Sequence, residues 1–249
     1  MFRTWPCGGQ SMDIPATIAF ARDSARSTGI ERDGVILDTV EHILAALYGL
    51  GIDNTVVTCD GPELPILDGS ACCVVESLEA AGIEEQDAPA RVCVLREPVF
   101  VSLGEAHAMA VPSDCLRITV ASEFRAPVGR SCIRVVVDPT TFKRELAGAR
   151  TPGFIEEWQP LKDAGLVKGA DRTNVLLVLE SDFGVTPRWP DEAGRHKALD
   201  LVGDLALIGA RLKADVTTVF GGHGLNRKLV RTLQGLVAIG ERDDGDHAD

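Results

Sequence analysis

The sequence predicts an α+β protein made of two similar domains, each a β-sheet packed against a pair of helices. Its 249 residues are 45% hydrophobic, which is enough for one large hydrophobic core or two small ones. Each half of the chain contains segments typical of strands and a pair of segments with helical periodicity. The polar stretch Gln86–Ala90 contains Pro89 and separates the two halves. We therefore expect domains at residues 1–88 and 89–240, followed by a disordered acidic tail at residues 241–249.

The first half is expected to contain two helices joined by a strand and a rigid loop. The first helix has an apolar stripe at helical spacing after Asp38, a residue type that caps helices, and Gly49 and Gly51 follow it as stop signals. The pattern before residue 30 is weak. In chain order we expect a strand near Ile18, a helix over residues 38–48, a strand over residues 55–59, a loop over residues 61–65 and a helix over residues 68–81.

The second half is expected to be richer in strands. An apolar run near its middle, VLLVL, is typical of a buried strand. Strands are expected over residues 91–95, 108–111, 116–121, 131–137, 174–179 and 217–220. Helical segments are expected over residues 142–147, 157–165, 191–209 and 225–237, with a glycine-rich turn over residues 221–224.

Charge and composition argue against several classes of protein. The net charge of −12 disfavours general binding of nucleic acid, which needs a basic surface. We find no secretory signal before Met12 and no apolar window long enough to span a bilayer, so we expect a soluble, cytoplasmic protein. The seven cysteines include no Cys-x-x-Cys pair, which predicts reduced and mostly buried thiols rather than disulfides or a thiolate metal site.

Three side chains spaced four residues apart are the first candidates for a functional site. His196, Asp200 and Asp204 stack along one face of the helix predicted over residues 191–209, and the rest of that helix is almost wholly apolar. An imidazole and two carboxylates in line can bind a metal ion, but a solvated polar face would show the same spacing. The spacing alone leaves both interpretations open.

Two other histidines lie in segments that suit a site. His42 follows Glu41 on a predicted helix, on the side opposite its apolar stripe, so the two form either a surface pair or a metal ligand beside a base. His223 lies between glycines just before a helix, either as an ordinary turn residue or as an imidazole that faces a ligand. Catalytic zinc commonly has three protein ligands, and two imidazoles with one carboxylate would fit that number. We assign no role to His107 or His247.

Five blocks of sequence follow one another in an order that is typical of one enzyme family. The blocks read TVEHILAALYGLGIDN at residues 39–54, GPELPILDGSA at residues 61–71, ARTPGF at residues 149–154, RHKALDLVGDL at residues 195–205 and GHGLN at residues 222–226. Together they resemble the UDP-3-O-acyl-N-acetylglucosamine deacetylase family, which acts at the committed step of lipid A synthesis. The resemblance covers roughly residues 30–238.

The resemblance implies a zinc-dependent amidohydrolase with two domains and an active site at their interface. It implies that zinc is bound by His42, His196 and Asp200. It further implies that Glu41 is the general base, that His223 is the acid or the cation that stabilises the oxyanion, and that Asp204 orients His223. Thr151 would donate a hydrogen bond to the oxyanion. Lys197 would contact the sugar or phosphate side of the substrate.

The chain departs from the family pattern in three places. The family's opening strands have no recognisable counterpart before Ile14, so we expect the first sheet to lose strands and hypothesise a homodimer through the exposed edge. Pro152 stands where the family usually has an aromatic residue. The segment in which the family builds its acyl-chain passage contains four polar side chains, Lys168, Asp171, Arg172 and Asn174.

These residues predict a zinc-dependent deacetylase that removes the N-acetyl group of UDP-3-O-acyl-N-acetylglucosamine. Fe(II) is an alternative to zinc, because a His-His-Asp set suits both metals. The catalytic set is intact while substrate-binding parts differ, so a second hypothesis is a deacetylase for another N-acyl amino sugar. A third is a metal-binding, non-catalytic partner or sensor, although such a protein would need neither Glu41 nor His223.

Overall fold

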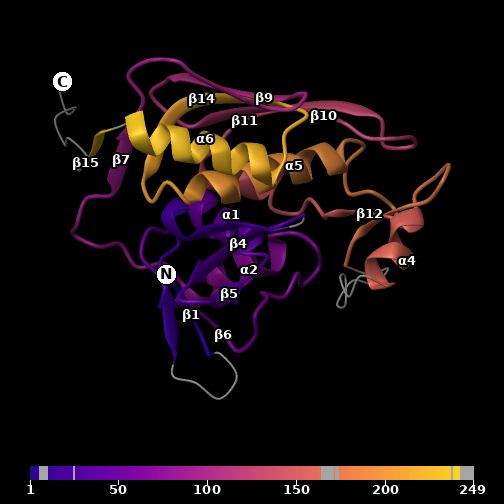
Figure 1. Ribbon diagram of the computed structural model, residues 1–249, viewed down its shortest axis with the longest axis horizontal. Coiled ribbons are helices and arrows are strands. Elements are labelled where there is room, and N and C mark those ends of the chain that lie inside the picture. The colour runs from indigo at the N-terminus through magenta and orange to yellow at the C-terminus, as the bar shows by residue number, and fades with distance from the viewer. Residues whose placement is uncertain (6–10, 25, 164–170, 172–173, 237, 242–249) are drawn as a thin grey trace.

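Helices lie between β-sheets in this protein (Figure 1). The computed structural model describes the chain except for residues 6–10, 25, 164–170, 172–173, 237 and 242–249. The largest sheet forms the upper layer, and α5 (Glu192–Ala206) and α6 (His223–Leu236) lie beneath it. Below them, α1 (Glu41–Gly49) and α2 (Cys72–Ala81) lie among the smaller sheets of the N-terminal half. The predicted α+β class is therefore confirmed.

The first half of the chain builds two three-stranded sheets from six short strands, β1 (Phe2–Thr4), β2 (Met12–Ile14), β3 (Ala21–Asp23), β4 (Thr28–Arg32), β5 (Val35–Leu37) and β6 (Val57–Cys59). One sheet has the order β2-β1-β6 and the other has the order β3-β4-β5. The strands β1 and β2 thus lie in the segment up to Ile14, where the sequence showed no recognisable strand. The strand expected near Ile18 is wrong, because residues Ile18–Phe20 form a 3₁₀ turn in which the Ile18 amide donates to the carbonyl of Leu207 at 2.8 Å.

The second half builds a seven-stranded sheet from β7 (Arg91–Val94), β8 (Val99–Leu103), β9 (Ala106–Pro112), β10 (Arg117–Glu123), β11 (Arg130–Val136), β14 (Arg211–Val219) and β15 (Ala238–Glu241). The central strand β14 runs parallel to β10 and β7 and antiparallel to β9, which in turn pairs with β8. Alternate residues of β14 are buried, so one face of this sheet packs against the helices.

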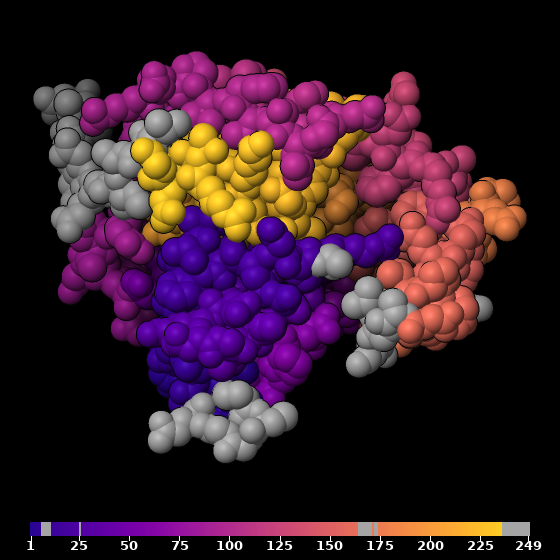
Figure 2. Space-filling model, in the orientation of Figure 1, coloured from indigo at the N-terminus to yellow at the C-terminus, as the bar shows by residue number. Residues whose placement is uncertain are grey.

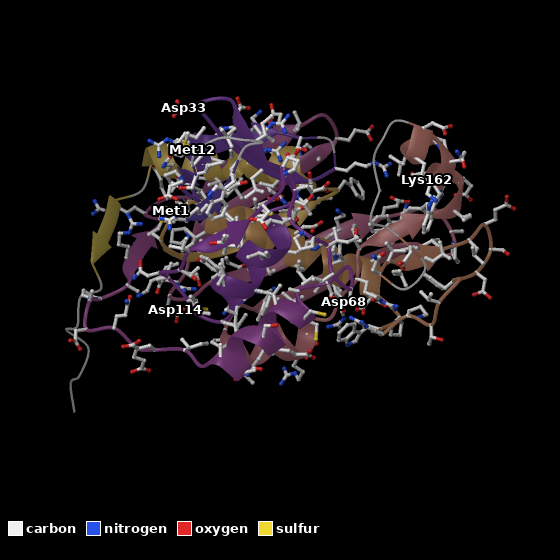
Figure 3. The ribbon with its side chains drawn as sticks, turned by 90° about the horizontal axis from the view of Figure 1, so that it is seen from below. Met1, Met12, Asp33, Asp68, Asp114 and Lys162 are labelled. Atoms are coloured by element: carbon white, nitrogen blue, oxygen red, sulfur yellow. The ribbon has the colours of Figure 1, made fainter. Side chains whose placement is uncertain are left out.

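A small arm extends from this body. It contains the parallel strands β12 (Pro152–Phe154) and β13 (Leu176–Val178) and the helix α4 (Ile155–Asp163). The helix α3 (Pro139–Glu145) belongs to the body, where it contacts β11 and α1. Figure 3 shows Lys162 of α4 set off to one side, far from Met1 and Met12. The ring of Phe154 stacks on that of Phe124 at 6.1 Å, which joins the arm to the end of the large sheet.

The helix α5 is buried on almost all sides, because it lies between α1 and the large sheet. Its Gly203 allows the close approach of α1: a Cβ atom at this position would overlap the carbonyl group of Glu41. The apolar residues of α5 belong to one hydrophobic core that runs through both halves of the chain. The polar stripe on α5 is therefore buried and is not a solvated face.

Several element ends differ from the predicted ones. The last helix begins at His223, two residues earlier than expected, so that histidine is part of the helix. The predicted acidic tail begins one residue too early, because Glu241 ends β15, and residues 242–249 lie outside the described residues.

Among the six described cysteines only Cys93 is buried, so the expected burial of most of them is wrong, although all six are free. None of the described helices is both long and apolar enough to cross a membrane.

Candidate active site between α1, α5 and α6

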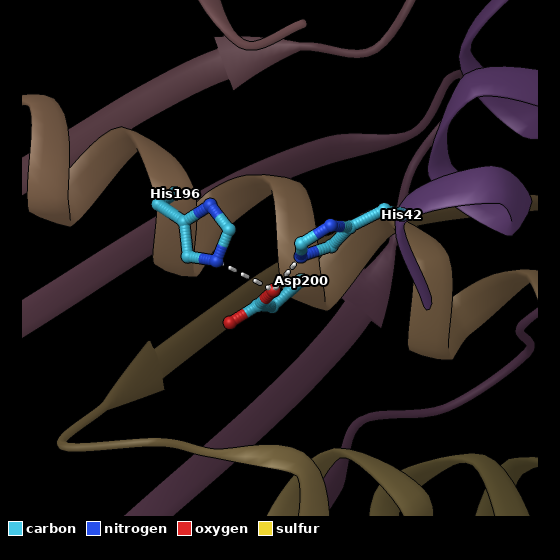
Figure 4. A group of neighbouring side chains, drawn as sticks. All are labelled: His42, His196 and Asp200. Atoms are coloured by element: carbon cyan, nitrogen blue, oxygen red, sulfur yellow. Dashed lines mark ion pairs between the residues drawn. The ribbon is translucent and has the colours of Figure 1, made fainter. Parts of the chain in front are cut away.

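Three side chains converge between α1 and α5 (Figure 4). His42 comes from α1, and His196 and Asp200 come from one face of α5; their ligand atoms all lie within 4.8 Å of one another. The Nε2 atoms of His196 and His42 lie 3.3 Å and 3.8 Å from Oδ1 of Asp200. Ligand atoms around one tetrahedral zinc ion lie roughly 3.3 Å apart, so these separations suit a shared metal ion. The structure brings together the three residues expected to be metal ligands.

Neighbouring groups orient two of these ligands. Nδ1 of His196 lies 3.0 Å from the carbonyl oxygen of Ala149. Because a carbonyl oxygen only accepts, Nδ1 carries the proton and Nε2 presents its lone pair to the site. The ammonium group of Lys197 donates to Oδ2 of Asp200 at 2.8 Å, and Oδ1 is the oxygen that faces the imidazoles of His42 and His196.

The donor atoms fit a metal ion in their hydrogen bonding and charge. Oδ1 of Asp200, which faces Nε2 of both imidazoles, is buried and has no hydrogen-bond partner within the described part of the chain. Burial and the neighbouring His196 lower the pKa of His42 to about 3, so its imidazole stays neutral. Burial alone would raise the pKa of Asp200, but His196 and Lys197 outweigh it and hold that pKa well below its ordinary range. A buried carboxylate oxygen without a donor is costly, and a cation bound at Oδ1 would compensate for it.

Glu41 lies beside the ligand set as a buried carboxyl group. Its Oε2 atom accepts a hydrogen bond from the backbone amide of Thr28 at 3.0 Å, and its Oε1 atom lies 3.9 Å from Nε2 of His223. Burial raises the pKa of Glu41 to about 7, and the neighbouring His223 partly opposes that rise. A carboxyl group with a pKa near neutrality is suited to take up and release a proton.

His223 and Asp204 form a buried pair across α5 and α6. Nδ1 of His223 donates to Oδ2 of Asp204 at 2.9 Å, while its Nε2 lies 3.7 Å from Oδ2 of Asp200. Burial alone would lower the pKa of His223, but the carboxylates of Asp204 and Asp200 outweigh it and raise the pKa to about 9. The imidazole is therefore cationic at neutral pH, as an acid that donates a proton must be.

A cleft of about 820 Å³ opens onto these groups. In Figure 2 the surface is hollowed between the N-terminal half, in indigo, and the segment around α4, in salmon. Thr151 and Lys197 line this cleft together with the metal-binding group, as expected from the resemblance. Its apolar lining residues include Phe124, Phe154, Trp158, Leu161 and Val175. The cleft thus combines a polar, charged end with an apolar wall.

The structure also shows supporting residues that the sequence analysis did not identify. Arg150 donates from its backbone amide and from Nε to Oε1 of Glu192, at 3.0 Å and 2.8 Å. This buried ion pair fixes the segment that supplies the Ala149 carbonyl and Thr151. Arg150 lies in one of the family-like blocks, which was a signal for it, whereas Thr28 lies in the weakly patterned segment and had none. His107 stacks on an exposed phenylalanine outside the cleft, and His247 lies outside the described residues.

A cationic imidazole, a carboxyl group with a pKa near neutrality and a candidate metal-binding group that share one cleft are typical of metal-assisted hydrolases. The comparison with known families then identifies the chain. It belongs to the UDP-3-O-acyl N-acetylglycosamine deacetylase family, whose sequence model matches residues 2–235. The match includes the segment before residue 30, so the family relationship extends further toward the N-terminus than the sequence blocks indicated.

Curated relatives carry the name UDP-3-O-acyl-N-acetylglucosamine deacetylase. The protein of Myxococcus xanthus is 40% identical over 227 residues, which cover 89% of this chain and 72% of the relative. The protein of Bdellovibrio bacteriovorus is 39% identical over 227 residues, covering 90% and 75%. The protein of Phenylobacterium zucineum is 42% identical over 204 residues, covering 80% and 69%. The family resemblance inferred from the sequence is thus confirmed.

Proposed function

We propose that this protein is a zinc-dependent deacetylase that hydrolyses the N-acetyl amide of UDP-3-O-acyl-N-acetylglucosamine in lipid A biosynthesis. The observation that carries the proposal is the placement of Glu41 and His223 beside the metal-binding group. Their facing atoms, Oε1 and Nε2, are 3.9 Å apart, and both side chains are buried. A protein that only bound a metal would need neither a base nor an acid at this place.

His42, His196 and Asp200 would hold the metal ion. A zinc ion bound there would act as a Lewis acid that polarises the acetyl carbonyl and makes water a stronger nucleophile near neutral pH. Fe(II) is the alternative, since two imidazoles and a carboxylate suit it as well. Lys197 neutralises part of the negative charge of Asp200 through its 2.8 Å contact with Oδ2.

The residues of the chain account for the proton transfers of amide hydrolysis. Glu41 takes a proton from the attacking water, whose oxygen forms a bond to the acetyl carbon. His223 gives its Nε2 proton to the sugar nitrogen as the carbon–nitrogen bond breaks, which yields acetate and a free amine. Asp204 keeps His223 protonated and oriented for this step. The hydroxyl of Thr151 is the proposed donor to the oxyanion, an interaction worth roughly 3 kcal/mol in comparable sites.

The shape of the cleft favours an acylated substrate. Its lining joins the charged groups named above to the side chains of Phe154, Trp158 and Leu161. An acyl chain would bury apolar surface against these residues, while the sugar remains at the polar end and its diphosphate near Lys197. Of the polar residues noted in the sequence near this passage, Lys168 and Arg172 lie outside the described residues, and Asp171 is exposed.

We further propose that the two halves are two domains, at residues 1–88 and 89–240, with the site at their interface. Residues 82–89, which are exposed and form no helix or strand, support a linker there. The proposed metal ligands also come from both halves.

The homodimer stays a hypothesis supported by the two edges of the β2-β1-β6 sheet, and a light-scattering mass of one chain at micromolar concentration would contradict it. The expected cytoplasmic location is likewise a prediction.

Acetate release from UDP-3-O-acyl-N-acetylglucosamine by the zinc-loaded protein tests the function directly. We expect acetate and the free amine in equal amounts, and no product from the same compound with a non-hydrolysable N-substituent. A panel of other N-acetyl amino sugars, with and without the acyl chain and the nucleotide, tests the second hypothesis. Turnover of a different sugar alone would replace the proposed substrate, and no turnover of any amide by the metal-loaded protein would contradict the enzymatic role.

A further inference from the structure

Thr28 touches both the base and the acid pair of the site. It is the first residue of β4 and is completely buried. Its backbone amide donates to Oε2 of Glu41 at 3.0 Å. Its hydroxyl contacts Oδ1 of Asp204 and lies 3.2 Å from Nδ1 of His223. One residue therefore connects two catalytic groups that come from different helices.

Arg227 sets the direction of the Thr28 hydroxyl proton. It lies one helical turn after His223 on α6 and is buried. Its Nη1 atom is 3.2 Å from Oγ1 of Thr28 and 3.2 Å from the carbonyl oxygen of Ser27. A guanidinium group only donates, so Oγ1 accepts from Arg227. The single hydroxyl proton is then directed to Oδ1 of Asp204, which accepts it.

Asp204 is held in place by three donors. Oδ1 accepts from Thr28, and Oδ2 accepts from Nδ1 of His223 at 2.9 Å and from Nδ2 of Asn226 at 2.8 Å. Asp204 is 0% exposed, so solvent does not replace a missing donor. Because both Thr28 and Asp204 direct their acceptor oxygens to Nδ1, that atom of His223 keeps its proton and Nε2 faces the cleft.

We propose that Thr28 is a positioning residue for the acid–base pair. Its amide fixes the carboxyl group of Glu41, and its hydroxyl fixes Asp204 and, through it, the ring of His223. The inference rests on the proposed deacetylase function, because it concerns the same acid and base. Without the hydroxyl, a buried oxygen of Asp204 would lose its donor, and the carboxylate would turn away from the geometry that orients His223.

Two substitutions at Thr28 distinguish the contribution of its hydroxyl group from that of its branched shape. Thr28→Val keeps the branched side chain and the amide but removes the hydroxyl, and we expect kcat to fall about 10- to 100-fold with KM within about twofold. Thr28→Ser keeps the hydroxyl, and we expect kcat within about threefold of the unchanged protein. Thr218→Val, in β14, is the matched control for the loss of a buried strand hydroxyl, and should leave kcat unchanged.

A measurement without substrate distinguishes this proposal from the proposed function. The Nδ1 proton of His223, assigned by its absence in His223→Gln, should give a slowly exchanging, hydrogen-bonded NMR signal in the unchanged protein and in Thr28→Ser. We expect the signal to shift or disappear in Thr28→Val, with an unchanged metal content by elemental analysis. If the unchanged protein released no acetate but these signals behaved as stated, the function would fail and the positioning role would stand.

Three results would overturn the proposal. The first is that the kcat and the Nδ1 signal of His223 in Thr28→Val equal those of the unchanged protein. The second is that kcat falls as strongly in Thr28→Ser as in Thr28→Val, because the hydroxyl group would then not be what positions the acid–base pair. The third is loss of the metal from Thr28→Val, which would assign Thr28 to the integrity of the whole site rather than to the acid–base pair.

Discussion

Asp204 and His223 lie on different helices, yet Oδ2 of Asp204 and Nδ1 of His223 are 2.9 Å apart in a buried pair. Asp204 lies one turn beyond Asp200 on α5, so the same helical face supplies a carboxylate of the candidate metal site and the partner of the proposed acid. Burial alone would lower the pKa of His223, but this carboxylate and that of Asp200 raise it to about 9. The two functions of the α5 stripe are thus separated by a single helical turn.

Removal of the Asp204 charge should shift the pH dependence of the reaction. The pKa of His223 is raised to about 9, mainly by Asp204 against the opposing effect of burial. Asp204→Asn should therefore lower that pKa, and the alkaline limb of a kcat/KM profile should move to lower pH. We also expect kcat to fall about 100-fold at neutral pH, the scale of acid catalysis. Asp215→Asn, on the large sheet, is the matched control and should change neither quantity.

The same pair makes a prediction about stability. The folded-state pKa of His223, about 9, lies above its ordinary value of 6.5. The stabilisation from this group is therefore fully present below pH 6.5 and is lost as the pH rises to about 9. Urea unfolding should show this loss between the two pH values in the unchanged protein and a smaller one in Asp204→Asn. Equal pH dependence of the two proteins would contradict the assigned cause.

Glu41→Gln should retain the metal and lose the reaction. The amide keeps an oxygen that can accept the Thr28 amide hydrogen bond, so the local structure should persist, but it cannot take a proton from water. We expect kcat to be at least about 100-fold lower, with zinc content by elemental analysis unchanged. Because burial raises the pKa of Glu41 to about 7, the acid limb of the pH profile should also be absent. Glu79→Gln, an exposed change on α2, serves as control; full activity of Glu41→Gln would refute the role of base.

Single replacement of a metal ligand should remove the metal. His42→Ala, His196→Ala and Asp200→Ala each take one donor from a set of three whose atoms lie within 4.8 Å of one another. We expect metal content to fall to a small fraction of one equivalent, with activity lost in parallel. His107→Ala removes an exposed histidine outside the cleft and should leave one bound ion. Reloading the chelator-treated protein with zinc or Fe(II) then shows which metal restores acetate release.

Much of the candidate site could be predicted because its residues form spaced patterns. The four-residue spacing of His196, Asp200 and Asp204 survives folding unchanged, since a helix keeps these residues on one face. The burial of His42 was harder to predict, because the helical wheel shows a single apolar stripe and His42 lies on the opposite side. In the structure α5 covers the other side of α1, so His42 is 7% exposed instead of being a surface residue. Thr28 gave no pattern at all, because its partners are brought to it only by tertiary packing.

The fold was less predictable where strands are short or where both of their faces are apolar. The N-terminal strands β1 and β2 have three residues each, too few for an alternation to be recognised. The strand β8 was missed for a different reason. Its outward-facing Phe100 is 65% exposed between the buried Val99 and Val101, so apolar residues occupy both faces and the alternation of apolar and polar residues cannot be seen. By contrast α5, predicted over residues 191–209, was found at Glu192–Ala206.

Loss of the buried ion pair between Arg150 and Glu192 should destabilise the protein and its site together. The side chains are 9% and 0% exposed, so removing one leaves an unpaired buried charge. We expect Glu192→Ala to lower the free energy of unfolding by about 3 kcal/mol in urea titration. Glu192→Gln keeps an acceptor and should cost less. An exposed pair, Lys143 with Glu79, is the comparison, and its loss should cost under about 1 kcal/mol.

Gly203 on α5 provides a test of how the site depends on the close approach of two helices. A Cβ atom here would overlap the carbonyl group of Glu41, so Gly203→Ala must push α1 away from α5. Since α1 carries Glu41 and His42, we expect weaker metal binding, a lower kcat and a loss of roughly 1–3 kcal/mol of stability. Gly49→Ala is equally crowded, against the ring of Phe142, but it lies at the far end of α1. It should lower stability by a similar amount while metal affinity stays near that of the unchanged protein. Equal metal affinities in the two variants would show that the α1–α5 contact at Gly203 supports the fold and does not set the geometry of the ligands.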